Sequence, residues 1–215
     1  MLIHLIKKDL LLMKKYVLFM LALTVILPLF VVWRLPSRAA LIGFILCSVY
    51  VEFMFFMLLC QKEAVYPKAE AVLCISPYKR ASLVQGKYLL FLLIFIWCFL
   101  IYELETMIFP VLYTPPSYLA AVFLINALFF SIYIPFQYKF GFERCKFGFM
   151  IILLGTSFLF PAFFKAVSEQ SLIDLRIISS VPAIFLAAVL LCAGAAVLTI
   201  SMLISVRIFK AKALL

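Results

Sequence analysis

Residues 61–87 read QKEAVYPKAEAVLCISPYKRASLVQGK and form the longest polar break in an otherwise apolar sequence. The segment carries five lysine or arginine residues and two glutamates. Ser76 before Pro77 has the pattern of a helix N-cap with proline at the first helical position, which predicts a short helix running toward a bend at Gly86. Apolar residues ahead of it recur at roughly helical spacing: Ala64, Val65, Ala69, Val72 and Leu73. Such a segment can fold outside lipid and contact a partner, or it is a solvated amphipathic loop.

On both sides of this break the chain is strongly apolar. Its 215 residues are 68% hydrophobic, and the mean hydropathy is +1.26. A soluble domain of this size has too little interior to bury that much apolar surface, so we expect lipid to surround it. The net charge is +10, but the basic residues lie between apolar runs and form no continuous patch. An anionic membrane surface is therefore the expected counter-charge, and no nucleic-acid partner is expected.

Six apolar segments are each close to the ~20 residues that cross ~30 Å of hydrocarbon. Backbone polar groups must be paired inside lipid, so these segments are predicted to be helices. They cover residues 16–33, 40–60, 88–109, 117–135, 147–164 and 181–205. The predicted fold is an all-α membrane protein in which residues 1–215 form a single transmembrane domain. Residues 110–116 predict a tight, proline-stiffened turn between two spans.

Residues 1–15 predict an amphipathic helix that lies in the headgroup plane ahead of the first span. At 100° per residue one face is mostly apolar, and the other carries His4, Lys7, Lys8, Lys14 and Lys15. Asp9 falls on the apolar face and Leu11 on the polar face, so the two faces are not clean. The helix is either a membrane anchor or a mechanical element.

The distribution of positive charge predicts the orientation. An even number of spans places both termini on one side of the membrane. With the N-terminus in the cytoplasm, 15 lysine and arginine residues lie in the inner segments, and the outer segments hold Arg34, Arg38, Lys165 and Arg176. The positive-inside rule therefore predicts that both termini and residues 61–87 and 136–146 are cytoplasmic.

Sequence features of metal, disulfide and nucleotide sites are absent. The six cysteines contain no CxxC pair and are predicted to be small apolar residues or reduced thiols, with neither zinc nor disulfides implied. The chain has no GxxxxGK[ST] phosphate-binding loop, so we do not expect it to bind ATP. One histidine and no paired acidic motif facing the cytosol argue against a membrane-embedded enzyme.

Three segments, in this order, resemble one family. IKKDLLLMKKYVL (residues 6–18) resembles an amphipathic elbow helix, and CISPYKRASLVQGKYLL (74–90) resembles the run that enters the third span. PFQYKFGFERCKFGF (135–149) is similar to a basic Tyr-Lys-Phe-Gly pattern. Together with the six spans, these segments resemble permeases of the type 2 family of ATP-binding-cassette exporters, in its bacterial branch.

The resemblance implies a pore of two permease chains, identical or related, in the bacterial cytoplasmic membrane. Two copies of a separate ATPase, which would bind Mg-ATP, would attach to the inner loops. By resemblance, residues 61–87 form the coupling loop, with contacts at Glu63, Tyr66, Lys68, Glu70, Leu73 and Ser76. Residues 136–146 would form a smaller contact through Tyr138, Lys139, Glu143 and Arg144. The cargo is expected to be hydrophobic or amphipathic peptides, with lipid or drug export as an alternative and a channel or structural subunit as another.

Three acidic residues lie in or near the predicted spans. Glu52 is roughly 12 Å from the inner end of the second span, and Glu103 and Glu105 lie near the outer end of the third. Intramembrane carboxylates are costly and usually face a cavity or a partner. Glu52 and Glu103 are candidates for the translocation path; the alternatives are that Glu52 bonds to a neighbouring helix and that an outer acid pairs with Arg34 or Arg38. Glu103 and Glu105 differ by 200° around the helix, so at most one faces a given cavity.

In the last span, small residues recur at i, i+4 and i+8, at Ala188, Cys192 and Ala196, beside Gly194. Small residues allow helices to approach closely. This row is predicted to pack within the bundle of one chain, and the alternative is a seam between two permease chains.

Overall fold

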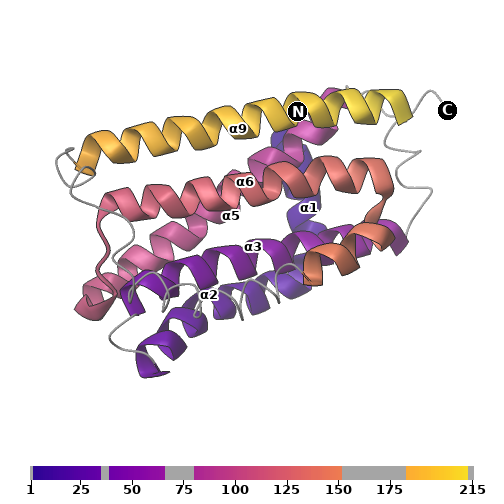
Figure 1. Ribbon diagram of the computed structural model, residues 1–215. Helices are drawn as coiled ribbons and strands as arrows, with labels where there is room; N and C mark the ends of the chain where they lie inside the picture. Colours follow the sequence, from indigo (N-terminus) through magenta and orange to yellow (C-terminus); the bar gives the residue numbers. More distant parts are fainter. Residues whose placement is uncertain (1, 35–38, 66–79, 152–182, 213–215) are drawn as a thin grey trace.

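The computed structural model describes residues 2–34, 39–65, 80–151 and 183–212, and these residues contain helices and no strand. Figure 1 shows the long helices gathered in a bundle in which α6 and α9 run side by side and α5 crosses them at an angle. The labelled elements are α1 (Leu2–Leu12), α2 (Lys14–Arg34), α3 (Ala39–Val65), α5 (Arg80–Ile108), the 3₁₀ turn η2 (Pro110–Leu112), α6 (Pro116–Phe140) and α9 (Ala183–Lys212). Residues 142–151 form a further helical stretch.

Five helices are long and apolar enough to cross a membrane: α2, α3, α5, α6 and α9. They match five of the six predicted spans and confirm an all-helical, multi-pass membrane protein. The predicted span 147–164 lies outside the described residues, except for its helical start at 147–151. The prediction of six spans is therefore tested for five of them.

Helices occupy part of each predicted inner loop. Helix α3 continues to Val65 and α5 begins at Arg80, so only residues 66–79 of the predicted loop 61–87 lie outside the described helices. The bend predicted at Gly86 is wrong, because α5 runs through it without a break. The predicted short helix from Pro77 to Gly86 lies outside the described residues at its start.

The predicted loop 136–146 is a break of one residue between two helices. Helix α6 ends at Gly141, whose φ of 82° favours glycine, and whose backbone N–H donates to the carbonyl of Gln137. Helical residues 142–151 then turn back along α6. The ring of Phe149 lies 4.8 Å from that of Tyr133 and 5.6 Å from that of Phe129.

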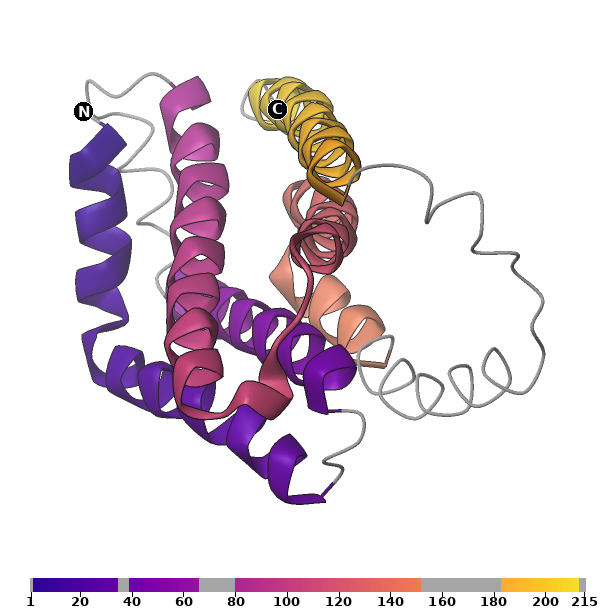
Figure 2. The ribbon, with the colours of Figure 1, turned by 90° about the vertical axis from the view of Figure 1, so that its left-hand side faces the viewer.

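Helix α1 runs crosswise to α6 and α9 and lies beside the first part of α5 (Figures 1 and 2). Its buried face is the row Leu5, Asp9 and Met13, and His4 and Lys7 are exposed. A helix is found over Leu2–Leu12 of the predicted 1–15, with Asp9 on its buried face as predicted, and a turn at Met13 separates it from α2. Its predicted position in the headgroup plane stays a prediction. A methyl group built on Gly86 would lie 3.6 Å from Cβ of Leu5, so α1 closely approaches α5 at this glycine.

The core of the bundle is aromatic. Phe130 of α6 is fully buried, with ring centroids 4.9 Å from Phe56 of α3 and 4.7 Å from Phe91 of α5. Phe44 lies 4.9 Å from Tyr102 in the same way, between α3 and α5. Rings at these separations add offset and edge-to-face attraction to the burial of their surface.

Helix α9 packs along α6 and is tied to α5 by hydroxyl groups. The Tyr88 hydroxyl lies 2.7 Å from the Ser201 hydroxyl and 2.9 Å from that of Ser205. At Gly194, a methyl group would lie 2.7 Å from the ring of Phe123, so only glycine permits this approach.

The prediction for the small-residue row of α9 is wrong. Ala188, Cys192 and Ala196 are exposed, whereas Gly194, about half a turn away from Cys192, faces α6. The row was identified by residue size alone. The close contact between α9 and α6 occurs instead at Gly194, on the face of α9 that α6 covers.

The predicted turn at 110–116 is confirmed. Pro110 begins η2, and Pro115 caps α6, which begins at Pro116. The Tyr102 hydroxyl donates to the Leu112 carbonyl at 2.9 Å and fixes η2 to the end of α5.

Candidate functional site

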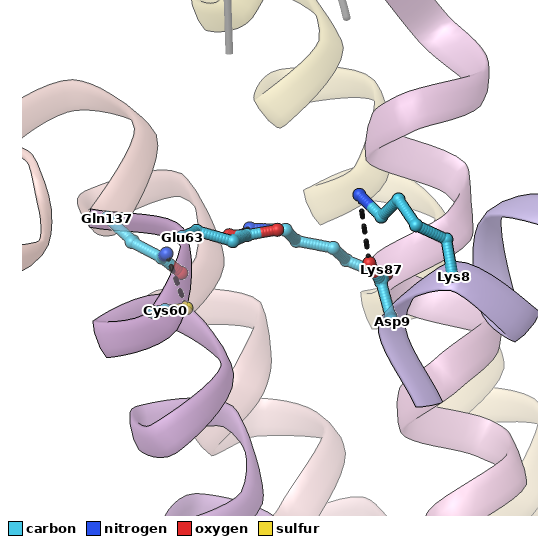
Figure 3. A network of polar contacts seen from close by, with 6 residues as sticks. All are labelled: Lys8, Asp9, Cys60, Glu63, Lys87 and Gln137. Carbon is cyan, nitrogen blue, oxygen red and sulfur yellow. Dashed lines mark hydrogen bonds and ion pairs between the residues drawn. The ribbon is translucent and has the colours of Figure 1, made fainter. Parts of the chain in front are cut away.

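A partly buried ion pair joins the helix ends that flank residues 66–79. Lys87 Nζ of α5 lies 2.7 Å from Glu63 Oε2 of α3 (Figure 3). The lysine side chain is 10% exposed and the glutamate 31%. Moving a charge from water into a protein interior is costly, so a buried lysine is retained where an acid and other polar groups surround it.

The end of α6 completes this contact. The Gln137 amide nitrogen lies 2.6 Å from the sulfur of Cys60, one turn before Glu63 on α3. Lys87 Nζ also lies 5.4 Å from the ring centre of Tyr138, within the range of a cation–π interaction. We refer to Cys60, Glu63, Lys87, Gln137 and Tyr138 as the helix junction, because they join α3, α5 and α6.

The junction extends to α9 and α1. The ring of Tyr138 lies 5.3 Å from that of Phe209 on α9. On α1, the buried Asp9 pairs with Lys8 at 3.0 Å. Burial raises the pKa of Asp9 above its ordinary value of 3.8, Lys8 opposes this, and the negative charge of Glu63 adds to it. The side chains at this end of the bundle are therefore electrostatically linked.

Because its folded pKa is raised, ionised Asp9 destabilises the protein at neutral pH. The folded state binds the proton more tightly than the unfolded state does, so this contribution is favourable near pH 3.8 and is lost as the pH rises through the folded pKa. We expect Asp9→Asn to raise the midpoint of thermal unfolding at pH 7, since the Lys8 side chain is 40% exposed and loses little. The advantage should shrink as the pH is lowered toward 4.

The measurement is thermal unfolding of the detergent-purified protein between pH 4 and pH 8, read as the difference between variant and wild type. Glu143→Gln is the control, because Glu143 is an exposed acid paired with Lys146 at 2.6 Å. A lower midpoint for Asp9→Asn at pH 7 would show that the Lys8 pair outweighs the burial of the carboxylate.

The structure divides the predicted ATPase contacts into three groups. Tyr66, Lys68, Glu70, Leu73 and Ser76 lie outside the described residues. Glu63 and Tyr138 belong to the helix junction, and Tyr138 is 9% exposed. Lys139, Glu143 and Arg144 are exposed, and their roles stay predictions.

The acid in the middle of α3, Glu52, is fully buried. Glu52 is 0% exposed, and neither of its oxygens has a hydrogen-bond partner among the described residues. One turn earlier, Ser48 accepts a hydrogen bond of 2.9 Å from Asn126 of α6, and the Asn126 oxygen also has no partner in the described part of the chain. The predicted bond from Glu52 to a neighbouring helix is therefore not found among these residues.

At the other end of α5, the buried acid is Glu105, with 6% exposure, and Glu103 is partly exposed. They point in different directions, as the 200° separation predicts. The alternative that an outer acid pairs with Arg34 or Arg38 depends on side chains outside the described set. The role of Glu103 in a path stays a prediction, and sequence reasoning missed that Glu105 is the more deeply buried acid.

An apolar groove runs between α6 and helical residues 142–151. Its volume is about 400 Å³, and it is lined mainly by phenylalanine: Phe129, Ile132, Phe136, Phe140, Arg144, Cys145, Gly148 and Phe149. Arg144 is the charged residue at this groove. Among the described residues, no group of three histidine, cysteine, aspartate or glutamate side chains is placed to bind a metal ion.

Comparison with known families identifies the family to which the chain belongs. A family model described as ABC-2 family transporter protein matches residues 4–210, which is nearly the whole chain. The chain belongs to the ABC-2 transporter family. It is thus a membrane permease of a family whose members associate with an ABC ATPase, as its sequence motifs predict. No curated protein and no solved structure matches this ABC-2 permease.

Sequence reasoning selected Glu63 of the ABC-2 permease as a candidate ATPase contact, which stays a prediction, and missed that Glu63 pairs with Lys87. In the sequence, Lys87 is one of many basic residues beside a predicted span, and no separate role is predicted for it. Its position directly after Gly86, where α1 approaches closely, and directly before a long apolar run was the available signal. Cys60 and Gln137 gave no signal of their own, because short polar contacts between spans have no sequence motif.

Proposed function

We propose that this chain is the membrane-spanning subunit of an ATP-driven exporter that moves hydrophobic or amphipathic peptides outward across the bacterial cytoplasmic membrane. Two permease chains, identical or related, enclose a path that opens alternately to each side. Two ABC ATPase subunits bind and hydrolyse Mg-ATP and drive the change.

The observation that carries this proposal is the helix junction. It joins α3, α5 and α6 at the helix ends that flank residues 66–79, and α9 contacts it through Tyr138. A force applied to those residues would reach four membrane helices through short polar and aromatic contacts. Such an arrangement suits a permease that is moved by a partner at this end.

The charge of the same end supports its orientation toward the cytoplasm. Lys62, Lys87, Lys139, Lys146 and Lys210 all belong to the predicted inner segments or their flanks. The predicted count of 15 basic residues inside against four outside follows the positive-inside rule. The ATPase of such a transporter works on the side where ATP is present.

The apolar character of the groove supports a peptide cargo. Four phenylalanines line a space of about 400 Å³, and an apolar peptide side chain would bury its surface there. Glu52 is proposed to line the path or to stabilise its closed form. Export of lipids or drugs is the second candidate, because the same groove with Arg144 at its side also suits an amphipathic molecule with an anionic group.

The test is co-purification with a candidate ABC ATPase, for which a gene next to this one would be the first choice, before and after charge reversal at Glu70. We expect Glu70→Lys to reduce both the recovered ATPase and the stimulation of its activity by roughly 5-fold or more, in the range of charge pairs at interfaces. Charge reversal at Glu63 is avoided, because it would also break the pair with Lys87.

The control is Tyr113→Lys, an exposed position beside η2 at the opposite end of the bundle. It should co-purify like the wild type. If the wild type binds no ABC ATPase, the exporter proposal fails. If Glu70→Lys retains full binding and stimulation, the placement of the contact is wrong.

A further inference from the structure

We propose that Lys87 is a positioning residue that makes the ends of α3, α5 and α6 move as one unit when the ATPase acts on the permease. The inference rests on the proposed function and adds to it the part that carries the motion. The predicted contacts at residues 66–79 bind the partner, and Lys87 passes the movement on.

Burial distinguishes Lys87 from the other cations of the described chain. Among the lysines and arginines whose side chains the structure describes, it is the buried one. A lysine in this position adds little net stability compared with a well-packed apolar residue, because pairing only repays the loss of hydration. Its advantage is geometric: it holds one arrangement of the helices that surround it.

The position of the pair along the helices suits this role. Glu63 is two residues before the end of α3, and Lys87 is seven residues after the start of α5, or about 10 Å along that helix. The pair therefore closes the two helix ends onto each other just inside the bundle. Movement of either end without the other would separate Glu63 from the buried Lys87.

Lys87 and the adjacent Tyr88 connect α5 to further helices. Lys87 lies over the ring of Tyr138 on α6, and Tyr88 bonds to Ser201 and Ser205 on α9. Two consecutive residues of α5 thus reach three other helices. Asp9 brings the crosswise helix α1 next to the same charges.

The experiment compares Lys87→Met, Lys87→Arg and Lys210→Met in the complex of the full chain with its ATPase. Methionine keeps the length and apolar stem of lysine without the charge, and arginine restores the charge. Lys210→Met makes the same change at an exposed lysine of α9 near the same end. Three quantities are measured: the amount of ATPase recovered, its stimulation by the permease, and amide hydrogen exchange across the permease.

We expect Lys87→Met to recover as much ATPase as the wild type, but to lose stimulation about tenfold, in the range of coupling between two sites. Amide exchange should rise in residues 61–65 and 80–86 and stay unchanged around η2. Lys87→Arg should restore both readouts, and Lys210→Met should resemble the wild type. Glu63→Gln should perturb the protein more than Glu63→Gln combined with Lys87→Met, because the single change leaves a buried lysine without its acid.

Normal stimulation in Lys87→Met, or equal effects of Lys87→Met and Lys210→Met, would overturn the positioning role. Loss of ATPase recovery in Lys87→Met would also overturn it, since Lys87 would then serve in binding. Failure of the wild-type chain to bind an ABC ATPase is a different result, which refutes the proposed function itself. The exchange measurement on the permease alone still tests whether Lys87 holds the helix ends together.

Discussion

Replacement of Phe130 by alanine is expected to lower the free energy of unfolding by about 3–5 kcal/mol. The ring is fully buried between Phe56 and Phe91 and also contacts Tyr133. Alanine would leave a cavity where three helices meet, and the surrounding rings cannot close it without moving their backbones. Much of the protein should be unfolded or aggregated after extraction into mild detergent.

The measurement is the thermal unfolding midpoint and the monodisperse fraction of the purified protein. Phe136→Ala is the matched control on the same helix, because Phe136 is 49% exposed. It should change the midpoint by far less than Phe130→Ala. Equal effects at the two positions would mean that α6 is buried on both faces in the purified protein.

Two substitutions of Glu52 are expected to differ sharply in their effect on folding. Glu52→Arg should prevent stable folding, because arginine stays charged and costs from about 3 kcal/mol upward in the middle of a membrane helix. Glu52→Gln should leave the fold intact, since glutamine keeps the size and shape of the side chain and places no charge in this buried site. Both are measured as the folded fraction in membranes and after extraction.

A strong loss of folding in Glu52→Gln would contradict this account, because it would show that the charged form is bound by something in the folded protein. The folded glutamine variant also tests the translocation path. Unchanged stimulation of the ATPase together with unchanged peptide export would exclude Glu52 from the path.

The apolar pattern predicted the helices well because lipid imposes a simple rule. Any segment of sufficient length must pair its backbone internally, so the positions of α2, α3, α5, α6 and α9 follow from hydropathy. The tight turn at 110–116 followed from its prolines. The amphipathic pattern likewise predicted α1 and placed Asp9 on its buried face.

The ends of the helices could not be predicted from hydropathy. Residues 61–65 and 80–87 include most of the polar side chains beside these spans, yet they continue α3 and α5, because packing against neighbouring helices stabilises the helix ends. Residues 136–140 continue α6 for the same reason. The polar residues set the predicted ends of the spans, and the helices extend past these positions.

The candidate site was predicted only in part because pairing depends on three-dimensional packing. Glu63 and Lys87 lie 24 positions apart, and nothing in the sequence distinguishes Lys87 from its basic neighbours. The same limit applies to α9, where residue size indicated the row at Ala188 but the contact with α6 occurs at Gly194.

Gly141 has a consequence for how the chain enters the membrane. A continuous helix from Pro116 to residue 151 would measure about 54 Å, well beyond the ~30 Å of hydrocarbon. Gly141 reverses the direction of the chain at one residue because it can adopt a positive φ. The following helical stretch therefore runs back along α6, where the ring of Phe149 contacts that of Tyr133. During synthesis, α6 and the next stretch can therefore leave the insertion machinery as a preformed helical hairpin, with their aromatic rings already in contact.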